Sequence, residues 1–597
     1  MKAQKAAPGQ SPENPFDIDR MTKEWGDIMR LSGDLAQNFI KKGETGDWPS
    51  VDPFNLQGSW LAMVDQMMQR PAQFTNAQFG FWKNYMALWD SALTRMTGGQ
   101  AQDIVENDPS DRRFRNELWH RDALFGFIRQ SYLLSAKYLT QMVDENSSTL
   151  EPEAAHKMKF FTKAFVDALS PTNFAFTNPE VIQTTIEQGG ENLVRGMRNL
   201  LEDMKRGKMR MTDESKFKLG ENIATTPGQV VFRNKMMELI QYAPAGEHTF
   251  QTPLLIAPPW INKYYILDLR PDNSFVKWAV EQGHTVFMVS WVNPDVTMKD
   301  VQFEDYKQDG IIAALDVIEK QTGQKQTNVI GYCIGGTLLS MSLAWMKANG
   351  MGDRVKSATF FTTLLDFADA GDLKLFVDEQ QLANLHDRMA KQGFLDAESL
   401  KSTFNLLRAN DLIWSFVINN YLMGREPFPF DLLYWNSDST NLPAGMHEFY
   451  LRHMYLKNEL IKPGCLEFGG VDIDLETIDT PAYFLSTRED HIAPWKATYA
   501  GSKMLGGPVT FTLAGSGHIA GVVNAPAANK YCYWTSSQPG SANTWLEKAR
   551  QENGSWWPHW QKWVEQFGGT KVAALNPAKG VLKPLCPAPG EYVLKKP

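Results

Sequence analysis

The amino-acid sequence predicts an α/β protein with a mostly parallel sheet, preceded by a mainly helical N-terminal domain. Before about residue 200, apolar residues follow helical spacing and β-branched alternating segments are scarce. After residue 250, short apolar strands alternate with amphipathic helices, which implies a parallel sheet with helices on both faces. Within that region, one strand continues through Gly-x-Cys-x-Gly into a helix, the local pattern of a nucleophile elbow.

Length and composition limit the functional classes that remain. The chain has 597 residues, of which 43% are hydrophobic and 12% aromatic, so it is globular rather than disordered, collagen-like or a disulfide scaffold. Its formal net charge of −8 provides no general positive field for a nucleic-acid backbone. We therefore expect several domains and no nucleic-acid partner.

The N-terminal sequence and the spacing of the cysteines indicate the cellular compartment in which we expect the protein. Residues 1–19 are polar and contain no apolar segment typical of a secretory signal, and no apolar run reaches the roughly 18–20 residues that cross a bilayer. Cys333, Cys465, Cys532 and Cys586 form neither CxxC pairs nor a repetitive framework. We expect a reduced, cytoplasmic protein with no transmembrane segment and no metal site.

The N-terminal third contains candidate amphipathic helices. Six apolar side chains fall on one helical face that ends at a Gly-Gly pair: Trp82, Tyr85, Met86, Trp89, Leu93 and Met96. Similar spacing occurs around residues 60–68 and over residues 124–142. Such a face either packs against its own domain or adsorbs to an apolar surface, and we favour packing.

Changes in composition suggest the domain boundaries. A short basic cluster from Lys205 to Arg210 is interpreted as a solvated linker, so we expect a helical domain over residues 1–205 and a catalytic domain over residues 206–597. The strand–helix alternation lapses over about residues 366–474, which are dense in Leu, Phe, Trp and Tyr. We interpret this stretch as a mostly helical insertion over the sheet edge. The Pro-, Gly- and Lys-rich tail after about residue 568 is expected to be irregular.

Apolar segments and the glycines between them define the elements of the catalytic domain. The expected strands are residues 253–257, 284–290, 327–330, 481–486 and 509–513. The expected helices are residues 274–282, 303–322 and 338–349, and each is followed by a glycine that can close its last turn: Gly283, Gly323 and Gly350. The tryptophans near the C-terminus are expected in the core: Trp556, Trp557, Trp560 and Trp563.

The most informative chemical feature is the segment Gly331-Tyr-Cys333-Ile-Gly335. A nucleophile at an elbow has a strained backbone, and glycines two positions on either side leave room for close packing of strand and helix. The following helix directs its N-terminal N–H groups and positive dipole end at Cys333, which favours a thiolate. Cys333 is therefore the predicted nucleophile, and the alternative is a small buried cysteine at a tight turn.

An acid and a base follow the nucleophile in the order that this elbow requires. Asp490 and His518 come just after the last two expected strands, at the carboxyl edge of the sheet. We predict His518 as the base and Asp490 as the acid that orients it. His491 is the alternative base and Glu489 the alternative acid. Because neighbours in an extended segment point to opposite sides, Asp490 and His491 do not easily face Cys333 together.

Two backbone N–H groups are expected to bind the oxyanion of an acyl-transfer reaction. One belongs to Ile334, the residue after the nucleophile, and the other lies in the loop after the first expected strand of the catalytic domain. In that loop Pro258 and Pro259 have no N–H, so Trp260 or Ile261 is the second donor.

The glycine-rich segment around His518 does not indicate a nucleotide site. Gly515, Gly517 and Gly521 superficially resemble a dinucleotide loop, but the third glycine is misplaced and a catalytic histidine explains the segment better. We expect no cofactor.

A cysteine nucleophile also bears on the substrate. A free thiol has a pKa of about 8.5 and is only slightly ionised at neutral pH, but a neighbouring histidine can pair with it and hold it ready. A cysteine exchanges acyl groups with a thioester at little thermodynamic cost. Acyl-CoA-type donors are therefore favoured over ordinary esters.

Five separated motifs together resemble the polyhydroxyalkanoate synthases. They are Gly331-Tyr-Cys333-Ile-Gly-Gly-Thr337, Ile261-Asn-Lys-Tyr-Tyr-Ile-Leu-Asp-Leu269, Tyr434-Trp-Asn-Ser-Asp-Ser-Thr-Asn441, Arg488-Glu-Asp490-His-Ile-Ala-Pro-Trp495 and Ser516-Gly-His518-Ile-Ala-Gly521. The resemblance runs from Arg112 to near residue 590, and the long chain with its helical N-terminal domain is similar to the class I enzymes. It implies an α/β-hydrolase fold in which the insertion caps the active site.

The resemblance also implies an activity. Such enzymes polymerise (R)-3-hydroxyacyl-CoA, here expected to be short-chain such as 3-hydroxybutyryl-CoA, into polyester and release CoA. Cys333 would carry the acyl group, with His518 as base and Asp490 as its partner, so the triad inferred from the residues and the family triad agree. The resemblance implies a homodimer associated with polyhydroxyalkanoate granules. The alternatives are a cysteine-dependent thioesterase of the same fold and a granule-coating structural protein.

Overall fold

The computed structural model describes residues 71–106, 108–109, 111–147 and 150–597. The helical pattern noted around residues 60–68 lies outside the described residues. The chain divides into two compact units. Of the described residues, those up to Asp213 together with 403–428 form one unit, here called the helical unit. Residues 214–402 and 429–597 form the other, here called the sheet unit.

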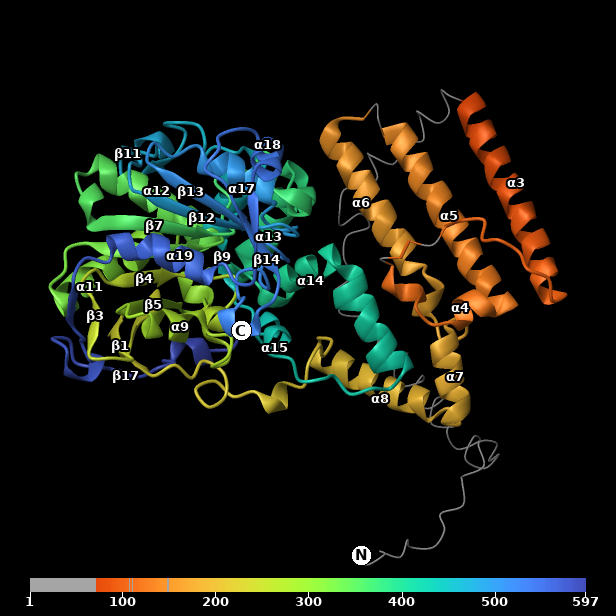
Figure 1. The fold of residues 1–597 in the computed structure, drawn as a ribbon, viewed down its shortest axis with the longest axis horizontal. Helices are drawn as coiled ribbons and strands as arrows, with labels where there is room; N and C mark the ends of the chain where they lie inside the picture. The colour runs from red at the N-terminus through yellow and green to blue at the C-terminus, as the bar shows by residue number, and fades with distance from the viewer. Residues whose placement is uncertain (1–70, 107, 110, 148–149) are drawn as a thin grey trace, which may run out of the picture. The chain divides into compact units, whose positions relative to one another are not determined.

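The helical unit is built from α-helices, as its periodicity predicts. In chain order they are α3 (Pro71–Met96), α4 (Leu118–Arg121), α5 (Ala123–Ser147), α6 (Pro152–Ala168), α7 (Pro179–Glu187) and α8 (Glu191–Arg206). Helix α5 packs between α3 and α6, and the three stand side by side in Figure 1. The segment 403–428 adds the end of α14 (Ala397–Leu407) and two π-helical turns, Asn410–Trp414 and Val417–Leu422, and packs on α8.

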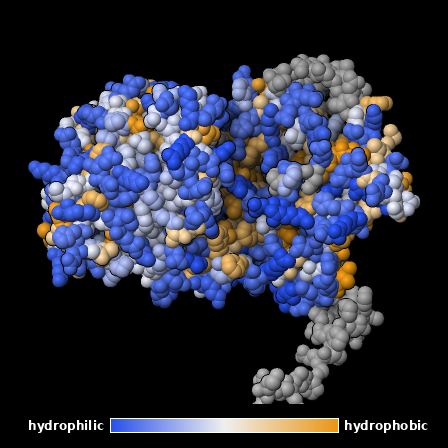
Figure 2. Space-filling view, in the orientation of Figure 1, coloured by the Kyte–Doolittle hydropathy of each residue, from blue (hydrophilic) through white to orange (hydrophobic). Residues whose placement is uncertain are grey.

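Helix α3 buries a different face from the one that the sequence analysis favoured. Leu88 and Ala92 are buried, and the Phe81 ring lies 5.0 Å from the Tyr138 ring of α5. Most residues of the predicted stripe are 50–66% exposed: Trp82, Met86, Trp89, Leu93 and Met96. The Trp89 ring, however, also lies 4.7 Å from the Phe127 ring of α5. The prediction was wrong because α3 is apolar on two faces and spacing alone does not select between them. In Figure 2 the helical unit shows patches of apolar surface.

The sheet unit contains an eleven-stranded sheet in the order β15-β14-β13-β12-β7-β6-β4-β5-β2-β1-β17. Its central strands from β13 to β5 are parallel, and antiparallel strands extend both edges. The central strands are β4 (Leu254–Ala257), β5 (Val286–Trp291), β6 (Thr327–Tyr332), β7 (Val355–Phe361), β12 (Ala482–Thr487) and β13 (Val509–Ala514). The edge strands are β1 (Gly228–Arg233), β2 (Met237–Tyr242), β14 (Cys532–Thr535), β15 (Arg550–Asn553) and β17 (Cys586–Pro587).

The expected parallel sheet is confirmed, but the sequence analysis did not identify β7, which lies between β6 and β12. Strand β7 contains polar residues that are nevertheless buried. Ser357 donates to Asn328 Oδ1 at 2.8 Å, and Thr359 Oγ1 accepts from Trp560 Nε1 at 3.0 Å. Because distant residues satisfy these hydroxyls, the apolar pattern of a buried strand is interrupted in the sequence.

Helices cover both faces of the sheet, as the strand–helix alternation predicts (Figure 1). Helices α11 (Ala313–Thr322) and α12 (Ile334–Ala348) contribute to one buried cluster, while α9 (Phe275–Glu281) and α19 (Trp557–Val564) contribute to the other. The helix expected over residues 303–322 is α10 (Phe303–Tyr306), a π-helical turn (Lys307–Ile312) and α11. The expected left-handed glycines have φ values of 92°, 72° and 70° at Gly283, Gly323 and Gly350. Of the four tryptophans predicted in the core, Trp556, Trp557 and Trp560 are fully buried, and Trp563 is half-buried against the same cluster.

The region 366–474 is mostly helical. It contains α13 (Glu379–Gln392), α14, α15 (Asp431–Ser437), α16 (Ala444–Phe449) and the π-helical segment Tyr450–Leu456. Two short strands, β8 (Phe394–Leu395) and β9 (Leu442–Pro443), pair antiparallel. The chain between them, here called the excursion, therefore begins and ends at this pair of strands. The tail after residue 568 has little regular structure, but β17 joins the main sheet and β16 (Lys571–Ala573) pairs with β3 (His248–Phe250). In the described part of the chain, no helix is long and apolar enough to cross a membrane.

Candidate active site

Cys333 lies at the sharp turn between β6 and α12. Its backbone has φ 52° and ψ −123°, a strained conformation for a residue with a Cβ, and its N–H donates to Phe361 O at 2.9 Å. A Cβ at Gly331 would lie 2.5 Å from Gly336 Cα, and one at Gly335 would lie 2.3 Å from Ala257 O. The two flanking glycines are therefore required for the close approach of the elbow to its neighbours.

The first turn of α12 lies directly after Cys333. Ile334 begins the helix, so its N–H has no acceptor within the helix. Gly336 N and Thr337 N donate to Cys333 O at 2.8 and 3.2 Å. The positive end of the helix dipole therefore faces the position where a negative charge would develop during acyl transfer.

Asp490 and His518 come together at the carboxyl ends of β12 and β13. His518 Nδ1 and Asp490 Oδ2 are 2.7 Å apart. Asp490 Oδ2 also accepts from Thr487 Oγ1 at 3.1 Å, and its Oδ1 accepts from the N–H groups of Ile492 and Ala493 at 2.9 Å each. Each carboxylate oxygen is thus fixed by two donors, and the carboxylate in turn fixes the imidazole.

His518 also interacts with Cys333. The ring is buried, which by itself opposes a positive charge, but the negative charge of Asp490 and the Cys333 thiol outweigh burial and raise the pKa of His518 to about 10. Because Nδ1 is bonded to Asp490, Nε2 is the nitrogen left for Cys333. The side chains of Cys333, His518 and Asp490 are therefore connected in a chain of contacts, and the histidine bonded to Asp490 is His518 rather than His491.

The loop after β4 approaches the elbow. The added Cβ at Gly335 that would collide with Ala257 O would also lie 2.9 Å from Pro258 O, so this loop begins beside the start of α12. Trp260 is buried, with its ring stacked on Tyr306 at 4.2 Å between centroids. Packing of this side chain anchors the backbone that carries the second predicted oxyanion donor.

A segment distant in sequence holds this loop, and the sequence analysis assigned it no role. Thr440 Oγ1 donates to the carbonyls of Trp260 and Ile261, and Thr440 N donates to Ile261 O at 3.2 Å. Trp435 Nε1 donates to Lys263 O at 2.7 Å. Lys263 Nζ forms a buried ion pair with Asp438 at 3.0 Å. The motif 434–441, noted only as a resemblance, is therefore the support of the loop after β4.

Two tyrosines of the π-helical segment Tyr450–Leu456 lie next to the elbow. Tyr450 and Tyr455 are buried, and their hydroxyls interact with each other and electrostatically with Cys333. Tyr450 also bonds to Thr337 in the first turn of α12. Burial is the main cause that raises the pKa of both phenols, so both remain protonated donors. No motif in the sequence marked these residues.

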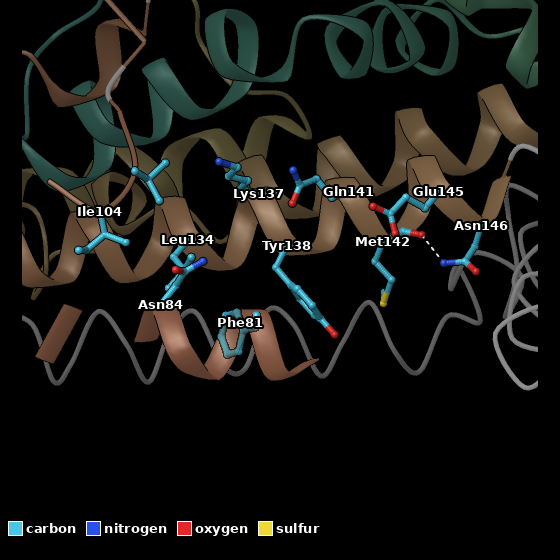
Figure 3. Close-up of a pocket in the computed structure, with 12 residues that line it drawn as sticks. Phe81, Asn84, Ile104, Leu134, Lys137, Tyr138, Gln141, Met142, Glu145 and Asn146 are labelled. Atoms are coloured by element: carbon cyan, nitrogen blue, oxygen red, sulfur yellow. Dashed lines mark hydrogen bonds between the residues drawn. The ribbon is translucent and has the colours of Figure 1, made fainter. Parts of the chain in front are cut away.

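A separate cavity of about 230 Å³ lies in the helical unit, between α3 and α5 (Figure 3). Phe81 and Asn84 of α3 line it together with Tyr138 and Gln141 of α5, with Tyr138 next to Phe81 and Ile104 at one end. None of the predicted catalytic residues lines this cavity.

Comparison with known proteins identifies the family. Residues 110–279 match the family described as Poly-beta-hydroxybutyrate polymerase (PhaC) N-terminus, and residues 268–525 match the alpha/beta hydrolase fold. The chain is 47% identical to Poly(3-hydroxyalkanoate) polymerase subunit PhaC of Rhizobium meliloti, over 94% of this chain and 92% of the relative. The chain belongs to the poly(3-hydroxyalkanoate) polymerase family.

Two further relatives of this family cover nearly the whole chain. The polymerase of Methylorubrum extorquens is 46% identical over 97% of both chains. That of Cupriavidus necator is 44% identical over 88% of this chain and 89% of its own. The family and the α/β-hydrolase fold expected from the five motifs are thus confirmed.

Proposed function

We propose that this protein polymerises (R)-3-hydroxyacyl-CoA into a polyester and releases CoA through a covalent thioester on Cys333. The observation that carries the proposal is the connected set of Cys333, His518 and Asp490 at a nucleophile elbow, in a chain of the polymerase family. A cysteine nucleophile suits a thioester donor, because one thioester is exchanged for another. Short-chain monomers such as 3-hydroxybutyryl-CoA are the proposed substrates.

Acylation is the first chemical step. Cys333 Sγ attacks the thioester carbonyl of the substrate, and its proton is held by His518. The carbonyl oxygen becomes an oxyanion that accepts from the N–H of Ile334 and of Trp260. When the tetrahedral intermediate collapses, the bond to the CoA sulfur breaks, and His518 returns the proton to the leaving thiolate. Asp490 stabilises the imidazolium throughout.

Elongation uses the same histidine as the base, but the leaving sulfur is now that of Cys333. The 3-hydroxyl of another acyl unit approaches the acyl group on Cys333, and His518 Nε2 takes the hydroxyl proton. The new ester bond forms as the bond from carbonyl carbon to Cys333 Sγ breaks, and the proton returns to the sulfur. A hydroxyl has a much higher pKa than a thiol, so this step depends more strongly on Asp490 than acylation does. None of these steps requires a cofactor.

Water must be kept from the acyl-enzyme, because water at the same position gives free acid. The buried side chains of Tyr450 and Tyr455, which interact electrostatically with Cys333, support this requirement because a buried site is less accessible to water. The thioesterase alternative lacks such support, and the relatives are named polymerases. A structural granule protein would need no bonded Cys-His-Asp set.

The polyester and its granule surface are the proposed macromolecular partners. The exposed apolar stripe of α3, from Trp82 to Met96, suits an apolar polymer surface. We further propose a homodimer and a location at polyhydroxyalkanoate granules in the cytoplasm, in line with the resemblance to class I enzymes.

The test separates polymer from free acid. Purified protein is incubated with 3-hydroxybutyryl-CoA, CoA release is followed with a thiol reagent, and the product is divided into solvent-extractable polyester and soluble 3-hydroxybutyrate. We expect most acyl groups in polyester. Stoichiometric free acid with no polyester would identify a thioesterase, and no CoA release would exclude both enzymes.

A further inference from the structure

The helical unit contains a segment that belongs, by its sequence position, to the insertion. Residues 403–428 leave the sheet unit within α14 and rejoin it before α15. The pair of β8 with β9, where Leu395 pairs with Leu442, closes the excursion at its base. The helical unit is therefore connected to the sheet unit by three chain crossings, at residues 213, 402 and 428, rather than by one linker.

Helix α8 holds this segment through side chains that bond to its backbone. Asn192 Nδ2 donates to Leu422 O at 2.9 Å, and Arg195 Nε donates to Gly424 O at 3.2 Å. One turn further along, Asn199 Nδ2 donates to Asn420 O at 3.1 Å. Asn192 and Asn199 are buried. Three backbone carbonyls of the segment thus accept hydrogen bonds from side chains on a single face of α8.

A glycine at the centre of that face allows the contact. A Cβ at Gly196 would lie 1.8 Å from Tyr421 O and 2.5 Å from Tyr421 C. No side chain, not even alanine, fits without moving the segment by more than an ångström. A glycine inside a helix lowers helix stability by about 1 kcal/mol relative to alanine, but here it allows direct contact between the α8 backbone and the segment.

Charged groups complete the contact. Tyr421 OH donates to Asp203 Oδ2 at 2.9 Å, and Asp203 also pairs with Arg210 at 2.6 Å. Asn420 Nδ2 donates to Arg210 O at 2.8 Å, which ties the segment to the chain just after α8. The contact combines buried polar groups, an ion pair and close packing, as a specific interface does.

The same excursion continues directly into elements of the active site. After residue 428 the chain forms α15 and the motif 434–441, which supports the loop carrying Trp260. It then returns through β9 to the π-helical segment whose Tyr450 and Tyr455 lie beside Cys333. The elements that contribute to the site therefore follow, along the chain, directly after the segment that α8 holds.

We propose that the α8 face formed by Asn192, Gly196 and Asn199 positions the insertion for polymerisation and keeps water from the acyl-enzyme. These are positioning residues, since they touch the segment 417–424 and not the reacting atoms. The proposal rests on the proposed polymerase function. It assigns the helical unit a direct part in the partition of acyl groups between polyester and free acid.

The test uses the full-length protein with Gly196→Ala, and with Gly80→Ala as the matched control. Gly80 lies in helix α3, and a Cβ there meets nothing within 4 Å. In Gly196→Ala we expect amide hydrogen exchange over residues 417–424 to accelerate at least tenfold while exchange in α5 stays unchanged. We also expect alkylation of Cys333 by iodoacetamide to accelerate, and the ratio of free acid to polyester to rise, each at least threefold. Gly80→Ala should match the wild type throughout.

Asn199→Ala provides a milder variant, since it removes hydrogen bonds without a collision, and it should shift all three readings in the same direction. Faster exchange over 417–424 with unchanged alkylation and product ratio would overturn the proposal, and so would unchanged exchange in Gly196→Ala. A proportional loss of polyester and acid together would mark general damage and would also count against it. A wild type that makes no polyester would refute the polymerase function, whereas exchange and alkylation would still test the positioning.

Discussion

At the scale of single residues, the proposed active site combines a cysteine with a strained backbone and an aspartate with every carboxylate oxygen hydrogen-bonded. Cys333 adopts positive φ because the elbow demands it, and Asp490 has four donors around its two oxygens. The surrounding fold holds the strained backbone of Cys333 and the fixed orientation of Asp490. The reacting groups are therefore in position before the substrate binds. Replacing one of these residues should therefore change chemistry more than stability.

The first prediction concerns the nucleophile. Cys333→Ala should abolish both CoA release and the covalent acyl adduct, because the thioester intermediate has no other attachment site at the elbow. Intact-protein mass spectrometry after mixing with 3-hydroxybutyryl-CoA measures the adduct. Cys465→Ser is the control: Cys465 is exposed, so its variant should retain turnover. An undiminished adduct in Cys333→Ala would assign the nucleophile elsewhere.

The second prediction concerns the charge on His518. Asp490 and Cys333 together raise its pKa to about 10, with Asp490 the larger of the two effects. The pKa should therefore fall in Cys333→Ala and fall further in Asp490→Asn. Nuclear magnetic resonance of protein labelled at histidine Cε1 measures it, and His284, buried with a pKa lowered to about 4, serves as an internal reference.

The same shift has a consequence for stability against pH. An unfolded histidine titrates near 6.5, and the folded pKa is higher, so the contribution of His518 to stability is complete below about pH 6.5. It is lost as the pH rises through about 10. This alkaline loss should be smaller in Asp490→Asn than in the wild type. An equal pKa in all three proteins would contradict the coupling of His518 to its neighbours.

Cys333, Asp490 and His518 could be proposed as catalytic residues from the sequence because each has a positional signal. Cys333 lies between a strand and a helix with glycines around it, and Asp490 and His518 each follow a strand end. Tyr455 and Thr440 carry no such signal. They reach the site from an insertion whose path depends on long-range packing, which no local pattern encodes.

At the scale of elements, the elbow shows how tightly the central strands constrain their connections. The start of α12 lies against the end of β4, and the close approach at Gly335 is to backbone atoms, which cannot rotate away as a side chain would. This rigidity constrains the distance between the two predicted oxyanion donors, one at the start of α12 and the other in the loop after β4.

The third prediction tests that approach. Gly335→Ala should destabilise the protein by about 1–3 kcal/mol, since the added Cβ overpacks a site without room, and it should also lower kcat by displacing Ile334. Urea unfolding and steady-state CoA release measure the two effects. Gly246→Ala is the control, because a Cβ at Gly246 meets nothing within 4 Å. Wild-type stability in Gly335→Ala would show that the elbow relaxes freely.

The elements themselves were predictable where periodicity is strong. Five of the central parallel strands and the helices between them follow from apolar segments closed by glycine. Strand β7 was missed because Ser357 and Thr359 interrupt its apolar pattern. The packed face of α3 was misassigned because two apolar faces compete, and only the position of α5 decides between them.

At the scale of the whole molecule, the helical unit and the insertion share residues 403–428. Deletion of residues 1–205 leaves every strand of the main sheet and Cys333, Asp490 and His518 in place. It also removes nearly all of α8 and so leaves the carbonyls of Leu422, Gly424 and Asn420 without their donors. The truncation should therefore leave the sheet unit folded but leave residues 403–428 without their contacts to α8.

The last prediction follows from that difference. In the truncated protein Cys333 should still react with iodoacetamide, because its elbow belongs to the sheet unit. Residues 403–428, however, should become the first site of limited proteolysis, since an unsupported excursion of this length exposes backbone to the protease. Polyester yield should fall and granule recovery should fall with it, because the exposed stripe of α3 is removed as well. Mass spectrometry of the proteolytic fragments locates the cleavage, and full-length protein is the control. Resistance of residues 403–428 together with full polyester yield would mean that the sheet unit alone holds the insertion in its working position.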